Sequence, residues 1–156
     1  IMENGGTFYE VADLGFGRCR FALAVPAGAD FYAGYHTRCI ASKYVNVTRN
    51  YFEKKNMDVD IVKIEGSVEL APILGLSDAI VDIVETGTTL KENGLVVAEE
   101  VCQVSARMIV NIASMKLRKT EINELITQVE SYVQEREAQK KANAEKTAQE
   151  KGADQA

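Results

Sequence analysis

Histidine and cysteine are scarce in this sequence, and their scarcity excludes several kinds of site. His36 is the only histidine, which removes most metal sites and leaves no well-placed base for a serine or cysteine nucleophile. We expect it to be a surface or packing residue. Cys19, Cys39 and Cys102 are odd in number and widely spaced. They indicate neither a disulfide framework nor a zinc cluster, and we expect three buried, reduced thiols.

Long apolar runs and an excess of positive charge are also missing. The longest apolar runs, Phe21 to Pro26 and Ala79 to Val84, have the length of strands, whereas a bilayer span needs roughly 20 residues. No signal peptide is evident. The formal net charge of −5 argues against a nucleic-acid partner, because proteins that bind the phosphate backbone concentrate lysine and arginine. We expect a cytoplasmic protein that binds neither nucleic acid nor a membrane.

What remains is the composition of an ordinary globular protein. The 156 residues are 46% hydrophobic and 26% charged, which suits a folded chain with one compact core or two small lobes. The sequence opens Ile1-Met2-Glu3 and enters a folded pattern soon afterwards. We therefore expect that an N-terminal segment has been removed.

Strands and helices alternate through most of the chain. Cys19 to Val25 is apolar and stops at Pro26, which predicts a buried strand. Three further strands are predicted over Cys39 to Ser42, Val59 to Ile64 and Ala79 to Val84, each followed by a helix that ends near Asn56, Leu74 or Glu92. Ser67 can cap the second of these helices. Such alternation implies crossover connections and a mainly parallel sheet.

Beyond Gly94 the pattern changes. An extended stretch from Leu95 to Asn111, interrupted by Ser105-Ala106-Arg107, is typical of a path that crosses between lobes. Apolar residues from Ile122 to Val133 have helical spacing, and no large aliphatic or aromatic residue follows Val133. We expect residues 134–156 to form a charged, solvated helix extension that frays into disorder.

The turn after the strand Ala79 to Val84 is the strongest candidate site. Gly87 lets the backbone approach an anion closely, and the N–H groups of Thr86 to Thr89 can converge on that anion. Asp82 and Glu85 would repel a phosphate alone, so they favour a ligand that also carries hydroxyl groups. A ribose 5-phosphate has both features. A well-capped turn with two solvated acids is the structural alternative.

Several blocks, in their order, make the chain resemble a known family. They are Asp13 to Arg20, Arg38 to Phe52, Gly66 to Pro72, Leu76 to Asp82, the threonine-rich turn, and Ser105 to Asn111. Together they resemble the short form of ATP phosphoribosyltransferase, the enzyme of the first step of histidine biosynthesis. That family joins ATP to phosphoribosyl pyrophosphate with Mg²⁺ and releases pyrophosphate.

The resemblance implies an α/β, two-lobed, periplasmic-binding-protein-like architecture with mainly parallel sheets and an incomplete first lobe. Residues 1–22 and 106–133 would belong to the first lobe, residues 23–105 would form the second lobe with the phosphoribosyl pyrophosphate site, and residues 134–156 would be the tail. The segment that the family places before this region helps to form the nucleotide side. Whether this chain alone is active therefore stays open.

Carried over by position, the resemblance also assigns site residues and partners. The phosphoribosyl pyrophosphate site would comprise Asp82, Glu85, Thr86, Gly87, Thr88 and Thr89. Further cleft contacts would be Arg38, Lys43, Arg49, Ser67 and Glu69, for which solvated charge or a plain helix cap is the alternative. No residue is assigned to a metal or to covalent catalysis. The short form works with a histidyl-tRNA-synthetase-like regulatory subunit, which implies a hetero-oligomer.

Two functions of other classes stay open on the residues themselves. One is a non-catalytic module with the same two-lobed architecture that binds a small molecule. The other is an interaction protein that docks a partner through the helix from Thr120 to Val133.

Overall fold

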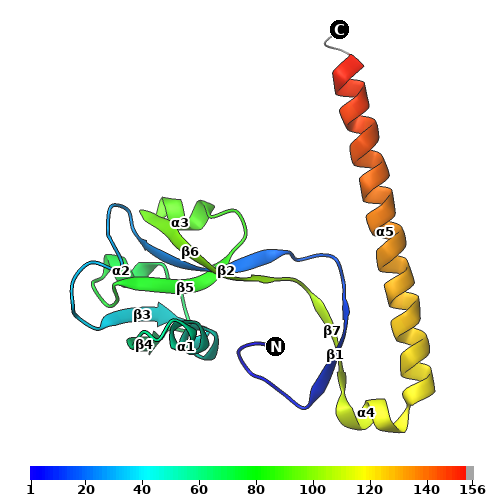
Figure 1. Cartoon of the computed structure of the whole chain (residues 1–156), viewed down its shortest axis with the longest axis horizontal. Coiled ribbons are helices and arrows are strands. Elements are labelled where there is room, and N and C mark those ends of the chain that lie inside the picture. Colours follow the sequence, from blue (N-terminus) through cyan, green and yellow to red (C-terminus); the bar gives the residue numbers. More distant parts are fainter. Residues whose placement is uncertain (154–156) are drawn as a thin grey trace. The chain divides into compact units, whose positions relative to one another are not determined.

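The computed structural model describes the backbone of residues 1–153 and the side chains of residues 1–144. Contacts divide the chain into two compact units (Figure 1). Unit 1 holds residues 1–6 and 18–104, and unit 2 holds residues 7–17 and those from Ser105 onward. The sequence analysis instead placed the boundary between the two lobes after residue 22. In the structure one unbroken strand begins at Cys19, so the change of unit falls before it. That the two units are the lobes of the family stays a prediction.

Unit 1 is built on a five-stranded sheet in the order β4-β3-β5-β2-β6. Its strands are β2 (Cys19–Pro26), β3 (Arg38–Ser42), β4 (Val59–Lys63), β5 (Ala79–Val84) and β6 (Leu95–Val104). β3 pairs in parallel with β4 and β5, whereas β2 is antiparallel to both β5 and β6. Four strands therefore run in one direction and β2 alone runs against them, so the predicted mainly parallel arrangement is confirmed. The first residue of β2, Cys19, lies opposite the last residue of β6, Val104.

Three helices follow the parallel strands, as predicted. They are α1 (Val45–Lys54), α2 (Leu70–Ile73) and α3 (Thr88–Glu92). The left-handed residue expected after α1 is Asn56, whose φ is 51°. The predicted cap at Ser67 is wrong, because α2 begins later and Glu69 is its N-cap residue. Ser67 is exposed and contributes its carbonyl oxygen, which accepts a hydrogen bond of 3.3 Å from the N–H of Leu70.

Alternate side chains of the central strands β2, β3 and β5 enter two different apolar clusters, because successive residues of a strand point to opposite faces. Phe21 and Leu23 of β2 pack in one cluster with Phe52 of α1. Ala22 and Ala24 pack in the other, with side chains of α2 and α3. Both faces of the sheet are therefore covered. This double cover explains why the strands read as continuous apolar runs in the sequence.

Unit 2 consists of an antiparallel ribbon and two helices. β1 (Phe8–Asp13) pairs with β7 (Arg107–Asn111), and α4 (Ile112–Leu117) and α5 (Lys119–Ala153) follow. The predicted extended path is therefore two strands, β6 and β7, separated at Ser105 and Ala106. Of the predicted tail, residues 134–153 continue α5, and residues 154–156 lie outside the described residues. Over the part of the chain that the structure describes, no helix combines the length and the apolar content needed to span a bilayer.

Candidate functional site

The chain leaves the carboxyl end of β5 through a tight turn, and Gly87 sets its shape. Gly87 has a φ of 78°, in the left-handed region that favours glycine. Its carbonyl oxygen accepts a hydrogen bond of 3.1 Å from the N–H of Lys91, which fixes the start of α3. The sequence therefore needs glycine at this position for a conformational reason, whatever the turn binds.

A pocket of about 410 Å³ within unit 1 borders this turn. It is lined by the predicted residues Asp82, Glu85, Thr86, Gly87, Thr88 and Thr89, and also by Glu69, Cys19, Ile83, Val84 and Leu90. The structure thus brings together all of the residues that the sequence assigned to a phosphoribosyl pyrophosphate site. Their role in binding that ligand stays a prediction.

Hydrogen-bond donors gather on the turn side of the pocket. The hydroxyl oxygens of Thr86 and Thr88 lie 3.0 Å apart, and the N–H of Thr88 is 3.4 Å from the Thr86 oxygen. Among the described residues, no protein acceptor takes a hydrogen bond from the N–H groups of Thr86, Gly87 or Thr89. These amides and hydroxyls are available to an anion.

Carboxylates make up another part of the wall. Burial raises the pKa of Asp82, and the negative charge of Glu69 acts in the same direction. The N–H of Ile83, which donates to Asp82 Oδ1 at 2.8 Å, and the positive charge of Lys43 act against this shift. Glu85 is exposed at the rim. The pocket therefore combines anion-binding donors with acceptors suited to hydroxyl groups.

The additional cleft contacts predicted from the family divide into two groups. Glu69 lines the pocket, whereas Arg38, Lys43, Arg49 and Ser67 are not among its lining residues. Lys43 follows β3 and is exposed, although its charge acts on Asp82. Arg49 is exposed on α1, where it donates to Asn46 Oδ1 at 3.3 Å.

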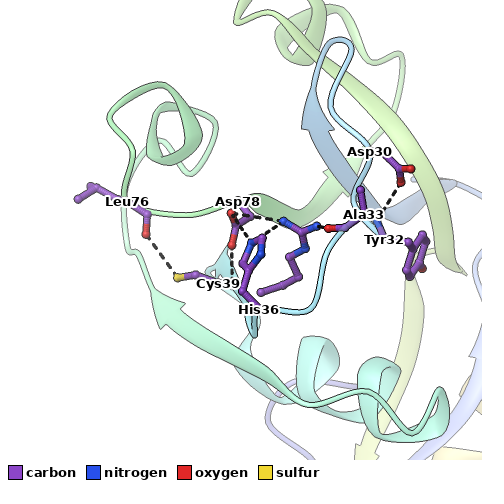
Figure 2. Close-up of polar contacts among 8 residues, drawn as sticks. Asp30, Tyr32, Ala33, His36, Cys39, Leu76 and Asp78 are labelled. Carbon is purple, nitrogen blue, oxygen red and sulfur yellow. Dashed lines mark hydrogen bonds and ion pairs between the residues drawn. The ribbon is translucent and has the colours of Figure 1, made fainter.

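Arg38 belongs to a polar cluster at the start of β3 (Figure 2). Its guanidinium lies 3.8 Å from Asp78 Oδ1 and 2.7 Å from His36 Nε2, and it donates to the carbonyl oxygen of Ala33. Asp78 also accepts a hydrogen bond of 2.8 Å from the N–H of Cys39. Arg38 begins β3, whereas the pocket lies where β5 ends. Because β3 and β5 are parallel, Arg38 is at the opposite end of the strands from the pocket. The cluster ties a loop to the sheet, and His36 is a surface residue, as predicted.

The cysteines differ from the sequence prediction. All three are thiols, but each is partly exposed instead of buried. Cys19 and Cys39 lie close to the starts of β2 and β3, and Cys102 lies in the edge strand β6. Sequence reasoning also missed that Cys19 lines the pocket. The antiparallel pairing of Arg20 with Val84 is what brings Cys19 to the pocket, and this pairing becomes visible only once the strand order is known.

Comparison with known proteins identifies the family. The HisG model, described as ATP phosphoribosyltransferase, matches residues 1–131. The chain belongs to the ATP phosphoribosyltransferase family. A family member from Clostridium kluyveri is 59% identical over 135 residues, which are 86% of this chain and 62% of that protein. The chain thus spans about 62% of the length of such relatives.

Solved structures support the same family and fold. The ATP phosphoribosyl transferase (HisG:HisZ) complex from Thermotoga maritima is 35% identical, with a TM-score of 0.75 over 85% of this chain and 65% of that chain. A mutant of ArgBP from T. maritima is 15% identical, with a TM-score of 0.56 over 82% of this chain and 56% of that chain. The second likeness shows the fold alone. Together they confirm the predicted two-lobed, periplasmic-binding-protein-like α/β fold class.

Proposed function

We propose that this chain carries the phosphoribosyl-binding part of an ATP phosphoribosyltransferase. The reaction condenses ATP with phosphoribosyl pyrophosphate, gives phosphoribosyl-ATP and pyrophosphate, and begins histidine biosynthesis. One observation supports the proposal above the others. The residues from Asp82 to Thr89 that the family resemblance singled out line one pocket, in a chain that belongs to that family.

The chemistry of the pocket matches a phosphorylated sugar. The amides and hydroxyls of Thr86 to Thr89 suit the 5-phosphate, because converging N–H groups bind anions without needing a basic surface. The carboxylates of Asp82 and Glu85 suit the ribose, because ionised carboxylates accept hydrogen bonds from hydroxyl groups. An overall net charge of −5 is therefore compatible with a phosphorylated ligand.

In the proposed reaction the adenine N1 of ATP attacks the anomeric carbon of the ribose. A new bond forms from N1 to that carbon while the bond from the carbon to pyrophosphate breaks, and the leaving group takes the electron pair. No protein nucleophile is needed. The pocket contributes by holding the ribose in line with its attacker, and such orientation can supply on the order of 7–11 kcal/mol.

Mg²⁺ suits this site as an ion that binds together with the phosphorylated ligand. Within the described residues no group of three or more histidine, cysteine, aspartate or glutamate side chains is placed to hold a metal. Mg²⁺ commonly binds through one or two carboxylates together with substrate phosphates and waters. Asp82 and Glu85 are carboxylates of the pocket that suit this arrangement. The bound ion would neutralise charge on the pyrophosphate.

We also propose that the complete enzyme acts in the cytoplasm, as a hetero-oligomer with a histidyl-tRNA-synthetase-like regulatory subunit. The solved relative from T. maritima is itself a HisG:HisZ complex, which supports the expectation of such a partner. Co-purification of the two gene products in one assembly is the expected result.

Calorimetry tests the proposed ligand directly. We expect the chain to bind phosphoribosyl pyrophosphate in the presence of Mg²⁺ with a saturable isotherm. A panel of amino acids and unphosphorylated sugars, titrated under the same conditions, should give no saturable heat. Saturable binding of an amino acid or free sugar without binding of phosphoribosyl pyrophosphate would favour the alternative, a non-catalytic binding module.

A further inference from the structure

The loop between β2 and β3, residues 27–37, is held at the start of β3 by the side chain of Arg38. The guanidinium donates to the carbonyl oxygen of Ala33, and its Cζ lies 5.7 Å from the centre of the Phe31 ring. Both partners belong to the loop. Only 11% of the Arg38 side chain is exposed. Its position therefore depends on the groups around it, because a buried charge is unfavourable unless it is paired.

The contact between Arg38 and His36 fixes the protonation state of the imidazole (Figure 2). Arg38 Nη1 lies 2.7 Å from His36 Nε2. A guanidinium carries only donors, so Nε2 is the acceptor and the imidazole is neutral, with its proton on Nδ1. The His36 side chain is 59% exposed, so solvent can protonate it. Imidazole groups change charge between about pH 5 and pH 8.

A proton on His36 Nε2 would reverse the preferences of this cluster. Nε2 could no longer accept from Arg38, and the two cations would repel each other. Asp78 Oδ1 lies 3.8 Å from His36 Nε2 and 3.8 Å from Arg38 Nη1, so it is within reach of both cations. The protonated imidazole can therefore compete with Arg38 for Asp78 as an ion-pair partner.

The other titratable groups around His36 come from the loop, from β3 and β4, and from the segment before β5. Asp30 in the loop accepts the N–H of Tyr32 at 3.0 Å. Burial and the negative charges of Asp78 and Asp60 raise the pKa of the Cys39 thiol, which therefore stays neutral. The N–H of Cys39 donates to Asp78 Oδ2 at 2.8 Å and holds this carboxylate in place whichever cation it meets.

We propose that His36 is a pH-sensitive latch on this loop. When the imidazole gains a proton, the hydrogen bond from Arg38 ends, the guanidinium leaves Ala33, and the loop detaches from the start of β3. The latch is independent of the proposed function, because it lies at the opposite end of the strands from the pocket.

A second anchor of the loop should survive this change. Tyr32 donates to Glu99 Oε1 on β6. Burial alone would raise the pKa of Glu99, but hydrogen bonds from Lys55, Tyr32 and Tyr51 lower it to about 2. Glu99 therefore stays ionised in the range where an imidazole titrates, and the loop opens only on the side of Arg38.

Amide hydrogen exchange of the 156-residue chain, followed by mass spectrometry, tests the latch. Protection factors of peptides that cover residues 27–38 are compared at about pH 8 and about pH 5, on either side of the imidazole titration. We expect the loop of the wild type to lose about tenfold in protection at the lower pH, as for the loss of one hydrogen bond to a charged group. Peptides from β2 should keep their protection. Unchanged protection of the loop, or an equal loss in β2, would overturn the proposal.

Two substitutions at His36 separate its proton from the rest of the side chain. His36→Gln offers Arg38 an uncharged acceptor at every pH, so the loop should stay protected at both pH values. His36→Lys carries a positive charge throughout, so the loop should be about tenfold less protected at both. Tyr35→Phe, at a fully exposed neighbour in the same loop, is the matched control and should behave as the wild type does.

The variants also show how the proposal could fail. If His36→Gln lost as much protection on acidification as the wild type, a group other than the imidazole would be the sensor, and the latch would be refuted. Protection of His36→Lys equal to that of the wild type at about pH 8 would refute it too, because a positive charge at this position would then leave the loop attached.

Discussion

The hydroxyl of Ser42 donates a hydrogen bond of 2.6 Å to the carbonyl oxygen of Val81, and this bond joins the end of β3 to β5. The hydroxyl oxygen of Ser42 also accepts a hydrogen bond of 3.0 Å from the N–H of Tyr44. Ser42 is fully buried. One side chain therefore satisfies the carbonyl group of Val81, next to Asp82 in β5, and the N–H of Tyr44, where the chain passes from β3 to α1.

Ser42→Ala should destabilise the protein by about 1–3 kcal/mol, because it leaves a donor and an acceptor at a buried position without a partner. Urea unfolding followed by circular dichroism measures the change. Ser131→Ala, on the exposed face of α5, is the matched control and should stay within about 0.5 kcal/mol of the wild type. Equal stability of the two variants would show that the Ser42 bonds contribute nothing.

Gly87→Ala should weaken the binding of phosphoribosyl pyrophosphate. A Cβ at Gly87 would meet only Val84 Cγ1, at an ordinary 3.7 Å, so the cost comes from its φ of 78° and not from a clash. For an L-residue that conformation costs roughly 1–2 kcal/mol, and asparagine tolerates it better than alanine. Calorimetry should therefore rank the affinities as wild type, then Gly87→Asn, then Gly87→Ala.

Gly94→Ala is the control for this series. Gly94 has a similar φ of 69°, a Cβ added there would meet no atom within 4 Å, and Gly94 does not line the pocket. The substitution should cost similar stability and leave the affinity for phosphoribosyl pyrophosphate unchanged. If Gly87→Ala bound this ligand as tightly as Gly94→Ala, the turn would not be the phosphate site.

Glu99 should confer stability that disappears in acid. Burial alone would raise its pKa, but hydrogen bonds from Lys55, Tyr32 and Tyr51 outweigh burial and lower the pKa of Glu99 from 4.5 to about 2. A carboxyl whose pKa is depressed by folding stabilises the protein above its unfolded pKa and loses that effect as pH falls. The window therefore runs from about pH 4.5 down to about pH 2.

Glu99→Gln tests this pH dependence. Because the ion pair with Lys55 is about a third exposed, solvent screening limits the expected loss above pH 5 to about 1 kcal/mol. The difference in unfolding free energy from the wild type should shrink as the pH is lowered toward 2. Glu53→Gln, on the exposed face of α1, should show no such trend. A difference that is independent of pH would contradict the assignment.

Cys19 should report on occupancy of the pocket. It lines the pocket, whereas Cys102 lies in β6 beside Met2, with the two sulfur atoms 3.9 Å apart. Ribose 5-phosphate should slow the alkylation of Cys19 by iodoacetamide and leave that of Cys102 unchanged, as measured by peptide mass spectrometry. Protection of both thiols would indicate a global change, and protection of neither would place the ligand elsewhere.

The sequence predicted those features that depend on local patterns. The continuous apolar runs of β2 and β5, the left-handed position of Asn56 and the glycine turn at Gly87 are set by nearby residues, and the structure confirms them. Features that depend on pairing between distant strands were missed. The ribbon of β1 with β7 and the entry of Cys19 into the pocket wall both follow from register and not from composition.

Arg38 shows what strand direction adds to a prediction made from the sequence, and its contact with a ligand stays a prediction. Its place in a block resembling the family suggested a ligand contact. The direction of β3, however, puts Arg38 at the opposite end of the strands from Asp82. There, Asp78 and the carbonyl oxygen of Ala33 use its donors. Glu69 from the same group of predictions lines the pocket because buried neighbours hold it there. Strand direction decides between such candidates, and a residue list cannot supply it.

Cys19 and Val104 lie opposite each other on paired strands, so most of unit 1 could be moved into another protein as one piece. Residues 18–104 enter and leave the sheet on adjacent antiparallel strands, so the two ends of this stretch are neighbours. A two-residue hairpin connection from Val104 back to Cys19 would close it into a ring with its strand pairing intact. The same geometry would let the stretch be inserted between two neighbouring antiparallel strands of a host protein.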